Sequence, residues 1–494
     1  MIQAPMLQFV HVERDMPAKR DAAARIGDFN EIYAHYAHAK AREQASRCSQ
    51  CGVPYCQSHC PLHNNIPDWL HLTAAHRLRE AYELSQATNS FPEICGRICP
   101  QDRLCEGNCV IEQAGHGTVT IGAIEKYLTD TAWEKGWVAP LAPPKERSES
   151  VGIIGAGPAG LAAADRLRRA GVQVVLYDRY DRAGGLLTYG IPGFKLEKQI
   201  VMRRVAQLQA GGAHFRLNCE VGRDIAFDAL RASHDAVIIA TGVYKPQDLP
   251  LPAPAPAPAP TSCAGEGALR SGVVQAIDYL TASNRIDFND NVPEFHNGSL
   301  NARGKRVVVI GGGDTAMDCV RTAVRQGAHS VKCLYRRDRA NMPGSQRETH
   351  NAEEEGVVFE WLSVPVGVIG QPVRAVMVRP MRLGPPDASG RQTPIPIAGE
   401  DRSEPADLVI KALGFEPENL PMLWGQADLV RTRWGTIRAQ HSSGATSLDG
   451  VYAIGDIVRG ASLVVWAIRD GQECASAVLQ NFHTPPPQTK AKYP

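Results

Sequence analysis

The sequence predicts an α/β protein in which a helical, cysteine-rich segment precedes two copies of one strand–turn–helix–strand unit. Eight of the 13 cysteines lie between Cys48 and Cys109, ahead of both copies. The copies begin at Val151 and Lys305, and each has an apolar strand, a glycine-rich turn, an Ala-rich helix and a second strand that ends in a charged residue. Strands that alternate with helices are typical of parallel sheets with crossover helices.

Composition and charge exclude several classes of protein. At 494 residues the chain has room for about three domains. Lys+Arg is 53 against Asp+Glu 52, so the formal charge of +1 provides no basic field for nucleic acid or an anionic membrane. Charges interrupt the N-terminal MIQAPMLQFVHVERDMPAKR, and no apolar run reaches the length of a membrane span. We therefore expect a cytoplasmic protein that binds neither nucleic acid nor membrane.

Changes in composition predict the domain boundaries. Helical periodicity, for example over 66–87, and the cysteines assign 1–145 to a helical domain that ends at the linker APLAPPKERSES. The first unit is expected to take 150–303 and 415–494, and the second 304–414. The Pro–Ala tract at 250–265 cannot join a sheet and is predicted to be an exposed linker.

The first unit has the pattern of a Rossmann-like dinucleotide-binding domain. Gly155, Gly157 and Gly160 form G-x-G-x-x-G between a strand and a helix. Gly155 permits a tight turn, and Gly157 lets the backbone approach a pyrophosphate closely. Gly160 allows close packing of helix on strand. Asp178 ends the second strand, where a carboxylate accepts hydrogen bonds from ribose hydroxyls. The remaining candidates in the turn and at the end of AVIIATG are Ala156, Pro158, Ala159 and Gly242.

A segment near the C-terminus is expected to return to this unit. Gly455 and Asp456 follow an apolar strand and precede a helix in VYAIGDIVRGASLVVWAIRDGQECA. Asp456 could accept a hydrogen bond from the polar side chain of a bound flavin. The alternative is a buried helix cap.

The second unit differs where its second strand ends. Gly311, Gly313 and Ala316 occupy the equivalent turn, but Arg336 and Arg337 stand where the first unit has its carboxylate. Guanidinium groups pair with a 2′-phosphate, so this unit should select NADPH over NADH. The alternative is a solvated basic strand end. The other candidates are Asp314 and Thr315 in the turn, Arg339 after the strand, and Gly414 at the end of LVIKALG.

The clustered cysteines indicate metal ligation. They form Cys48-x2-Cys51-x4-Cys56-x3-Cys60-Pro61, then Cys95-x3-Cys99-Pro100 and Cys105-x3-Cys109. A Cys-Pro at the end of such a run is typical of ferredoxin-type iron–sulfur sites. Structural zinc is the main alternative, yet only the first two cysteines form the C-x2-C knuckle usual for zinc. The five scattered cysteines, interpreted as ordinary small core residues, are Cys219, Cys263, Cys319, Cys333 and Cys474.

Together these motifs resemble the small-subunit family of bacterial NADPH-dependent glutamate synthases. The resemblance runs from about Cys48 to the C-terminal helix. The segments that carry it are CSQCGVPYCQSHCP, ICPQDRLCEGNC, GAGPAG, GGLLTYGIPGFKL, GGGDTAMDCVRTAVRQGA, YRRDRANMPGSQRE and AIGDIVRGASLVVWAI. The wider family includes the flavin and iron–sulfur part of dihydropyrimidine dehydrogenase and subunits of bifurcating transhydrogenases. The Pro–Ala tract departs from the family pattern in a variable linker.

The resemblance implies FAD in the first unit, NADPH in the second and two 4Fe–4S clusters with interleaved ligands. Gly185 and Leu186, in GGLLTYG, join the FAD candidates. One cluster would be held by Cys48, Cys51, Cys56 and Cys109. The other would be held by Cys60, Cys99 and Cys105, with either Cys95 or Glu125 as fourth ligand. The implied partner is a large subunit carrying FMN and an iron–sulfur cluster, which makes L-glutamate from L-glutamine and 2-oxoglutarate.

This interpretation predicts cofactor chemistry rather than a catalytic side chain. NADPH gives up a hydride and a cluster accepts single electrons, so a flavin must stand between them. A disulfide reductase of the thioredoxin-reductase kind would need a redox C-x-x-C, which Cys319 and Cys333 are too far apart to form. A cluster-bearing sensor or scaffold would not explain two nucleotide sites. Within the family, a pyrimidine reductase-like or transhydrogenase-like complex is the alternative.

Overall fold

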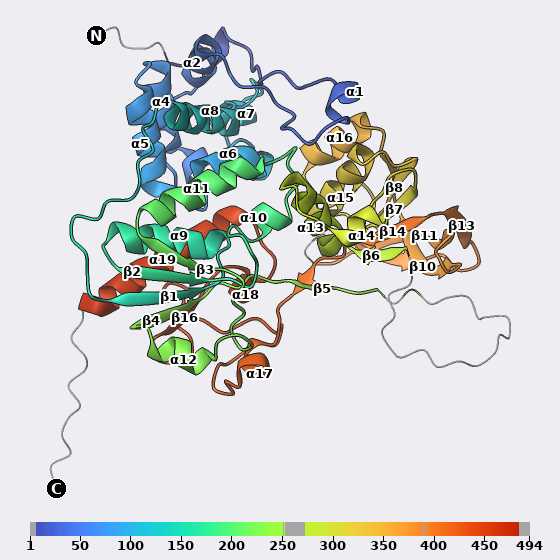
Figure 1. Ribbon diagram of the computed structural model, residues 1–494. Coiled ribbons are helices and arrows are strands. Elements are labelled where there is room, and N and C mark those ends of the chain that lie inside the picture. The colour runs from blue at the N-terminus through green and yellow to red at the C-terminus, as the bar shows by residue number, and fades with distance from the viewer. Residues whose placement is uncertain (1–5, 250, 252–271, 389, 391, 484–494) are drawn as a thin grey trace.

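The computed structural model describes residues 6–249, 251, 272–388, 390 and 392–483 (Figure 1). Apart from residue 251, the predicted Pro–Ala linker at 250–265 lies outside the described residues, as does Cys263. None of the helices in the described part of the chain is long and apolar enough to cross a membrane.

The N-terminal part is helical, as predicted. Its α-helices are α1 (Ala22–Arg25), α2 (His38–Ser46), α3 (Tyr55–Ser58), α4 (Ile66–Ala74), α5 (Leu78–Thr88), α6 (Pro92–Ile98), α7 (Val110–Gln113) and α8 (Ile121–Glu134), with 3₁₀ turns η1 (Gln8–Val10) and η2 (Gln101–Arg103). The helical stretch at 66–87 is two helices, because His76 between them has φ 62°. Trp69, Leu70, Ile124 and Leu128 form part of the buried core beneath the cysteines.

The first unit is a parallel five-stranded sheet of order β16-β4-β1-β2-β3. Its strands are β1 (Ser150–Ile154), β2 (Gln173–Tyr177), β3 (Ala213–Arg216), β4 (Ala236–Ile239) and β16 (Val451–Ala453). Its helices are α9 (Pro158–Arg169), α10 (Leu186–Tyr189), α11 (Lys198–Ala210), α12 (Phe227–Ala232), α17 (Leu420–Trp424), α18 (Asp456–Arg459) and α19 (Val464–His483). The chain therefore returns to this sheet near the C-terminus, as the sequence pattern predicts.

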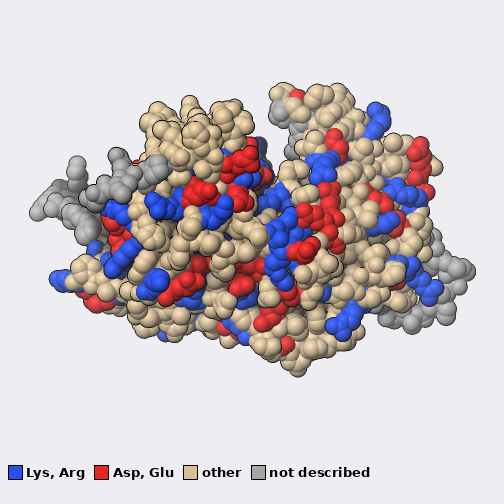
Figure 2. All heavy atoms as spheres, turned by 90° about the horizontal axis from the view of Figure 1, so that it is seen from above, with Lys and Arg blue, Asp and Glu red and all other residues tan. Residues whose placement is uncertain are grey.

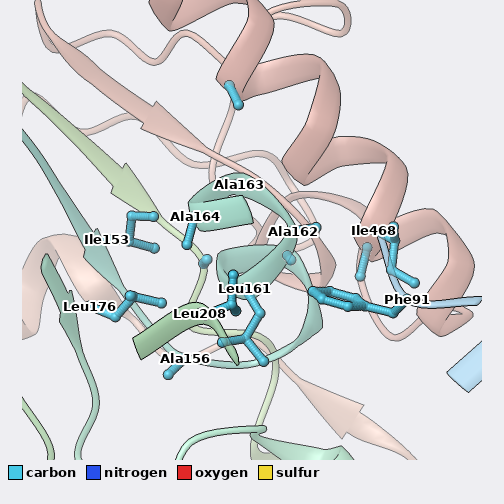
Figure 3. Close-up of a cluster of buried hydrophobic side chains, with 14 of the residues drawn as sticks. Phe91, Ile153, Ala156, Leu161, Ala162, Ala163, Ala164, Leu176, Leu208 and Ile468 are labelled. Carbon is cyan, nitrogen blue, oxygen red and sulfur yellow. The ribbon is translucent and has the colours of Figure 1, made fainter. Parts of the chain in front are cut away.

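The core of the first unit is continuous with the cysteine-rich domain. Figure 3 shows Phe91 of the helical domain beside Ile468 of α19, in the same cluster as Leu161 of α9. Cys95 and Cys99 are buried in this cluster too. A shared apolar core resists relative movement of the two domains, because separating them would expose that surface to water.

The second unit is a parallel sheet of order β6-β14-β7-β8-β9. Its strands are β6 (Val273–Gln275), β7 (Arg306–Ile310), β8 (Ser330–Leu334), β9 (Val358–Glu360) and β14 (Leu408–Lys411). Its helices are α13 (Ala276–Asp287), α14 (Pro293–His296), α15 (Asp314–Arg325) and α16 (Gln346–Glu354). An antiparallel sheet covers one face through Val368, Val376 and Val378. That sheet is formed by β10 (Ser363–Ile369), β11 (Ala375–Pro386), β12 (Gln392–Pro396) and β13 (Arg402–Pro405).

One segment pairs outside the unit to which its sequence position assigns it. Strand β6 lies within the range 150–303 expected for the first unit, yet Val273 pairs with Val409 of the second sheet. The ribbon between the units consists of β5 (Lys245–Pro246) and β15 (Phe415–Glu416). We propose that the chain crosses between the units at this ribbon, so that β6 and α13 belong with the second.

The N-terminal strap, residues 16–34, ties the helical domain to the second unit. Arg25 is buried and donates to Glu355, with 2.8 Å between Nε and Oε1, and to the Asn351 carbonyl at 3.2 Å. Lys19 reaches Glu354 at 2.7 Å. In Figure 1 helix α1 lies against α16 of the second unit, far from the remaining N-terminal helices. Three parts of the chain therefore meet at one junction.

Candidate nucleotide and iron–sulfur sites

The first glycine turn has the conformation that close approach to a pyrophosphate requires. Gly155 has φ +107°, and a Cβ there would lie 2.4 Å from the Ala240 carbonyl oxygen. A Cβ on Gly160 would lie 2.0 Å from the Gly155 carbonyl oxygen. Gly157 caps α9, so its neighbouring amides face the pocket at the helix N-terminus. This is an anion-binding geometry.

One pocket, the first-unit pocket, brings most of the predicted FAD residues together. Those that line it are Gly155, Gly157, Pro158, Ala159, Asp178, Leu186, Gly242 and Asp456. Of the others, Gly185 packs so closely on Gly157 that a Cβ on Gly185 would lie 2.9 Å from the Gly157 Cα, while Gly455 is the N-cap of α18. The Ala156 amide points to Asp178.

Asp178 has a role in the turn besides the predicted ribose contact. Its Oδ2 accepts from the Ala156 amide at 2.7 Å and its Oδ1 accepts from the Tyr180 amide at 2.9 Å. Burial raises the pKa of the Asp178 carboxyl, and these two amides oppose that rise. The carboxylate thus holds the glycine turn in shape while it lines the pocket.

Asp456 lines the first-unit pocket, and the residue that caps α18 is Gly455 rather than Asp456. Asp456 is the first residue of α18, after Gly455 at φ 71°. Burial raises the pKa of the Asp456 carboxyl to about 7, and a hydrogen bond from the Ser462 amide opposes the rise. A buried carboxyl with unused acceptor capacity fits a hydroxyl-bearing ligand in this pocket.

The second glycine turn repeats the geometry of the first with more room. Gly311 has φ +146°, and a Cβ there would lie 2.2 Å from the Ala412 carbonyl oxygen. Gly313 caps α15 and has open space around its Cβ position. Ala316 is fully buried where the first unit needs glycine. Asp314 Oδ1 accepts from the Ser345 amide at 2.9 Å, and Gly414, at φ +98°, borders open space.

The three predicted phosphate-binding arginines lie at or beyond the end of β8. Arg336 is exposed, and Arg337 is half-buried with its Nε 3.2 Å from the Gln392 carbonyl oxygen. Arg339 forms an ion pair with Glu353 at 2.6 Å. Arg339 is exposed like Arg336 but is held by Glu353, so Arg336 is the exposed arginine of the three that is best placed to meet an incoming phosphate.

A second pocket, the junction pocket, joins the three parts of the chain. It shares one wall with the first-unit pocket, formed by Leu186, Ile191, Ser462, Leu463 and Val464. Asp314 and Thr315 of the second glycine turn form another wall, and Cys99 and Pro100 of the helical domain a third. Groups bound at the two turns can therefore meet beside the cysteines.

Sequence reasoning missed the polar lining of the junction pocket. Lys195 Nζ lies 2.8 Å from Asp318 Oδ1 and 4.0 Å from Glu348. Ser345 Oγ is buried and has no hydrogen-bond partner within the part of the chain that is described, so it is available to a ligand. The only signal in the sequence was that these residues fall in or beside GGLLTYGIPGFKL, GGGDTAMDCVRTAVRQGA and YRRDRANMPGSQRE.

The cysteines assigned to the second cluster, called here the second set, line a separate cavity. Cys60, Cys95, Cys99, Cys105 and Glu125 all border it. Glu125 Oε1 accepts from the side-chain amides of Asn64 at 3.0 Å and Asn89 at 3.2 Å, and burial raises the pKa of the Glu125 carboxyl to about 8. Both candidate fourth ligands therefore face the same space as the other three.

The first set of cysteines, Cys48, Cys51, Cys56 and Cys109, comes from two segments that lie far apart in the sequence. Burial, with a smaller contribution from the charges of Cys109 and Cys51, raises the pKa of the Cys48 thiol to about 11. Burial likewise raises the pKa of Cys56 to about 12, with Cys48 and Cys109 adding to the effect. Cys48 and Cys109 are buried in the same core cluster, against which Cys56 packs, so Cys109 lies with the cysteines of the earlier segment.

Among the described residues, which include all eight clustered cysteines, no three His, Cys, Asp or Glu side chains lie together as a single metal ion requires.

The remaining thiols form no redox pair facing the nucleotide pockets in the part of the chain that the structure describes. Cys319 and Cys333 are both fully buried in the apolar core of the second unit, and burial raises the pKa of each thiol. Thiols of this kind are unreactive at neutral pH.

Two family models match nearly the whole chain. The iron–sulfur domain II of dihydropyrimidine dehydrogenase, described as 4Fe–4S cluster, matches residues 25–137, and pyridine nucleotide-disulphide oxidoreductase matches residues 149–471. The glutamate synthase NADPH small chain of Azospirillum brasilense is 60% identical over 97% of this chain and 96% of its own length. That of Escherichia coli K12 is 44% identical over 96% of this chain and 98% of its own length.

The chain belongs to the family of glutamate synthase NADPH small chains. The predicted fold class and the prediction of an NADPH-dependent oxidoreductase that uses FAD, NADPH and 4Fe–4S clusters are confirmed by this family and the two domain matches. In the family, the name small chain implies a larger partner subunit. Among solved structures, Mycobacterium tuberculosis FprA in complex with NADPH is 20% identical over 68% of this chain and 85% of its own length, with TM-score 0.55, a likeness of fold alone.

Proposed function

We propose that this chain is the electron-input subunit of a glutamate synthase. It oxidises NADPH and passes the electrons by way of FAD and two 4Fe–4S clusters to a large subunit. The large subunit, which carries FMN and its own iron–sulfur cluster, makes L-glutamate from L-glutamine and 2-oxoglutarate. The observation that carries the proposal is the junction pocket, whose walls come from the first-unit pocket, the second glycine turn and the cysteine-rich domain.

The first-unit pocket would hold FAD. The amides at the start of α9, behind Gly155 and Gly157, suit the pyrophosphate, and Asp178 suits the ribose. Asp456 suits the hydroxyls of the flavin side chain. When bound, a flavin accepts a hydride and returns electrons one at a time.

The second unit would hold NADPH with its nicotinamide end in the junction pocket. The turn at Gly311 and Gly313 lets the backbone approach the pyrophosphate, and Arg336 and Arg337 suit the 2′-phosphate. Leu186, Ile191 and Leu463 make the shared wall apolar, which keeps water from the space in which the two rings would meet.

The cysteines would hold the two clusters in a fixed order. Cys99 lines both the junction pocket and the cavity of the second set, so that set would be the nearer of the two to a bound flavin. The charge of Cys56 contributes to raising the pKa of the Cys105 thiol, so the first set would come next in line. Burial raises the pKa of the free thiols, so binding of a cluster must release protons. We propose Cys48, Cys51, Cys56 and Cys109 for one cluster.

For the other cluster we propose Cys60, Cys99 and Cys105, with Cys95 and Glu125 as competing fourth ligands. Substitution separates them. If Glu125 is the ligand, E125Q changes the electron paramagnetic resonance signal of one reduced cluster while C95S leaves it unchanged. The reverse pattern would assign Cys95.

Reconstitution tests the proposed function directly. Purified without oxygen, the chain is expected to contain one FAD, about eight irons and eight labile sulfides, and to reduce artificial acceptors with NADPH. Given NADPH, glutamine and 2-oxoglutarate alone it should form no glutamate, whereas addition of the large subunit should start glutamate formation. Two zinc ions without labile sulfide, or glutamate made by the chain alone, would overturn the proposal. We also propose that the complex works in the cytoplasm.

A further inference from the structure

The two glycine turns differ in the residue that begins the helix behind them. In the first unit this residue is Pro158, which is neutral, whereas in the second it is Asp314. A dinucleotide places its pyrophosphate at this helix N-terminus, where backbone amides and the helix dipole attract it. A carboxylate at the same end competes for the dipole and repels the phosphates. A cation beside Asp314 would offset a repulsion that the first unit does not have.

The cation that lies there comes from the cysteine-rich helical domain. Arg103 belongs to the 3₁₀ turn η2, between Cys99 and Cys105. Its Nη2 lies 3.8 Å from Asp314 Oδ2, and its Nη1 donates to the Pro343 carbonyl oxygen at 3.0 Å. The distance to the carboxylate is longer than that of a hydrogen bond. Arg103 is therefore close enough to offset the charge without being used up by it.

The Arg103 guanidinium has donors to spare. It carries five N–H groups, and its bond to the Pro343 carbonyl is its single hydrogen bond in the part of the chain that the structure describes. The side chain is 45% exposed, so a ligand can reach the remaining donors. A guanidinium with free donors beside a helix N-terminus can pair with two phosphate oxygens at once.

Two further contacts hold η2 and the second glycine turn together. The Gly344 amide donates to the Gly312 carbonyl oxygen at 2.9 Å, so the segment that Arg103 contacts packs on the turn itself. Arg347 Nη1 donates to Gln101 Oε1 at 3.1 Å, two residues before Arg103. The position of Arg103 beside the turn is therefore fixed by several contacts between the two domains and does not depend on its own side chain alone.

Local charges matter here because the overall charge gives a nucleotide little guidance. The formal net charge is only +1, and Figure 2 shows side chains of both signs intermixed over most of the face that it presents. The phosphates of a dinucleotide must then be met by individual side chains. Arg336 and Arg337 are proposed for the 2′-phosphate, which leaves the pyrophosphate to be met at the glycine turn.

We propose that Arg103 is an NADPH-binding residue, supplied to the second unit by the helical domain, which pairs with the pyrophosphate and offsets the charge of Asp314. This inference rests on the proposed function and adds to it a binding residue from outside the nucleotide unit. Because Arg103 stands between Cys99 and Cys105, the bound nucleotide would touch the loop that carries two members of the second set of cysteines.

Isothermal titration of the complete holoprotein with NADP⁺ and with 2′-AMP tests the proposal, because 2′-AMP has the 2′-phosphate but no pyrophosphate. R103A should bind NADP⁺ about 10- to 100-fold more weakly, as loss of a charge-assisted hydrogen bond does, and should bind 2′-AMP as wild type does. R103K keeps the charge and should recover part of the loss. R79A is the matched control, since Arg79 is an exposed arginine of α5 that pairs with Glu83, and it should bind both ligands normally.

A second variant tests the balance of charge. D314N keeps an oxygen that can accept from the Ser345 amide but removes the carboxylate charge. R103A/D314N should therefore bind NADP⁺ about fivefold more tightly than R103A. Wild-type affinity of R103A for NADP⁺, equal losses of NADP⁺ and 2′-AMP affinity in R103A, or a double variant no better than R103A would overturn the inference. Failure of the proposed function itself would appear differently, as wild-type protein that binds neither ligand.

Discussion

The two dinucleotide units share one strand order but are assembled from the sequence in different ways. The sheets β16-β4-β1-β2-β3 and β6-β14-β7-β8-β9 correspond strand for strand. In the first unit the edge strand β16 arrives from the C-terminal end of the chain, whereas in the second the edge strand β6 precedes the rest. The position of an edge strand is thus set by pairing geometry, and its place in the sequence is free to vary.

The units also differ in what surrounds the glycine turn. In the first, Asp178 reaches back to the Ala156 amide and stiffens the turn from the end of β2. In the second, arginines follow the end of β8, and Asp314 within the turn accepts from the Ser345 amide instead. A carboxylate repels a 2′-phosphate and a guanidinium attracts it. One scaffold can therefore bind two different dinucleotides through a change at one strand end.

The largest effects are expected from substitutions that disable one dinucleotide unit at a time. In G155A the Cβ meets the Ala240 carbonyl oxygen at 2.4 Å with φ at +107°. Strain of about 1–3 kcal/mol from φ alone, with the clash added, should weaken FAD binding at least about 100-fold. G311A should lose NADPH oxidation yet keep its flavin. Flavin absorbance after gel filtration, with NADPH oxidation rates, measures both, and loss of flavin from both variants would show that the units are not independent.

A smaller effect is expected from substituting the arginines that follow strand β8. R336A removes a charge-assisted hydrogen bond worth about 1.5–3 kcal/mol, so kcat/KM for NADPH should fall about 10- to 100-fold while that for NADH hardly changes. R337A should act similarly, but its contact with the Gln392 carbonyl gives it a structural role as well. R339A tests whether the third predicted arginine, which is paired with Glu353, contributes at all. Steady-state rates with the two nucleotides decide the matter, and equal losses with both would contradict phosphate recognition.

A third effect concerns pH and the carboxyl of Asp456. Its pKa of about 7 without flavin should fall when flavin hydroxyls donate to it, so FAD binding releases a proton at pH below 7. Affinity for FAD should therefore rise with pH, by at most about tenfold per unit, up to about pH 7 and level off above it. Titration of the flavin-free protein at pH 5.5, 6.5 and 7.5 measures the slope. D456N should abolish it, and an unchanged slope in D456N would assign the proton elsewhere.

The smallest effect is expected from exchanging the residues at the third position of the two glycine turns, Gly160 and Ala316. A316G should lower the thermal stability only slightly, because glycine in a helix costs about 1 kcal/mol relative to alanine, and the KM for NADPH should stay within about twofold. G160A should be worse tolerated, since its Cβ would lie 2.0 Å from the Gly155 carbonyl oxygen. Thermal melts of the two variants compare them, and equal losses would show that the extra room in the second unit is not used.

The glycine turns, the strand–helix order and the helical cysteine domain followed from the sequence because each depends on neighbouring residues. A tight turn needs glycine where φ is positive, and Gly155 and Gly311 both stand there. The charges at the ends of β2 and β8 likewise lie at a fixed distance along the chain from their turns. Local backbone geometry fixes where residues at such spacings lie, so these features can be predicted without knowing the rest of the fold.

Only the tertiary structure decided which distant segments meet. The antiparallel sheet over the second unit, the pairing of β6 with β14, the contact of Lys195 with Asp318 and the insertion of Arg25 beside Glu355 all join residues far apart in sequence. The polar lining of the junction pocket was missed for the same reason. Such contacts form because buried apolar surface and buried charges must find partners, and which partners they find depends on how whole domains pack, not on the spacing of residues within any one segment.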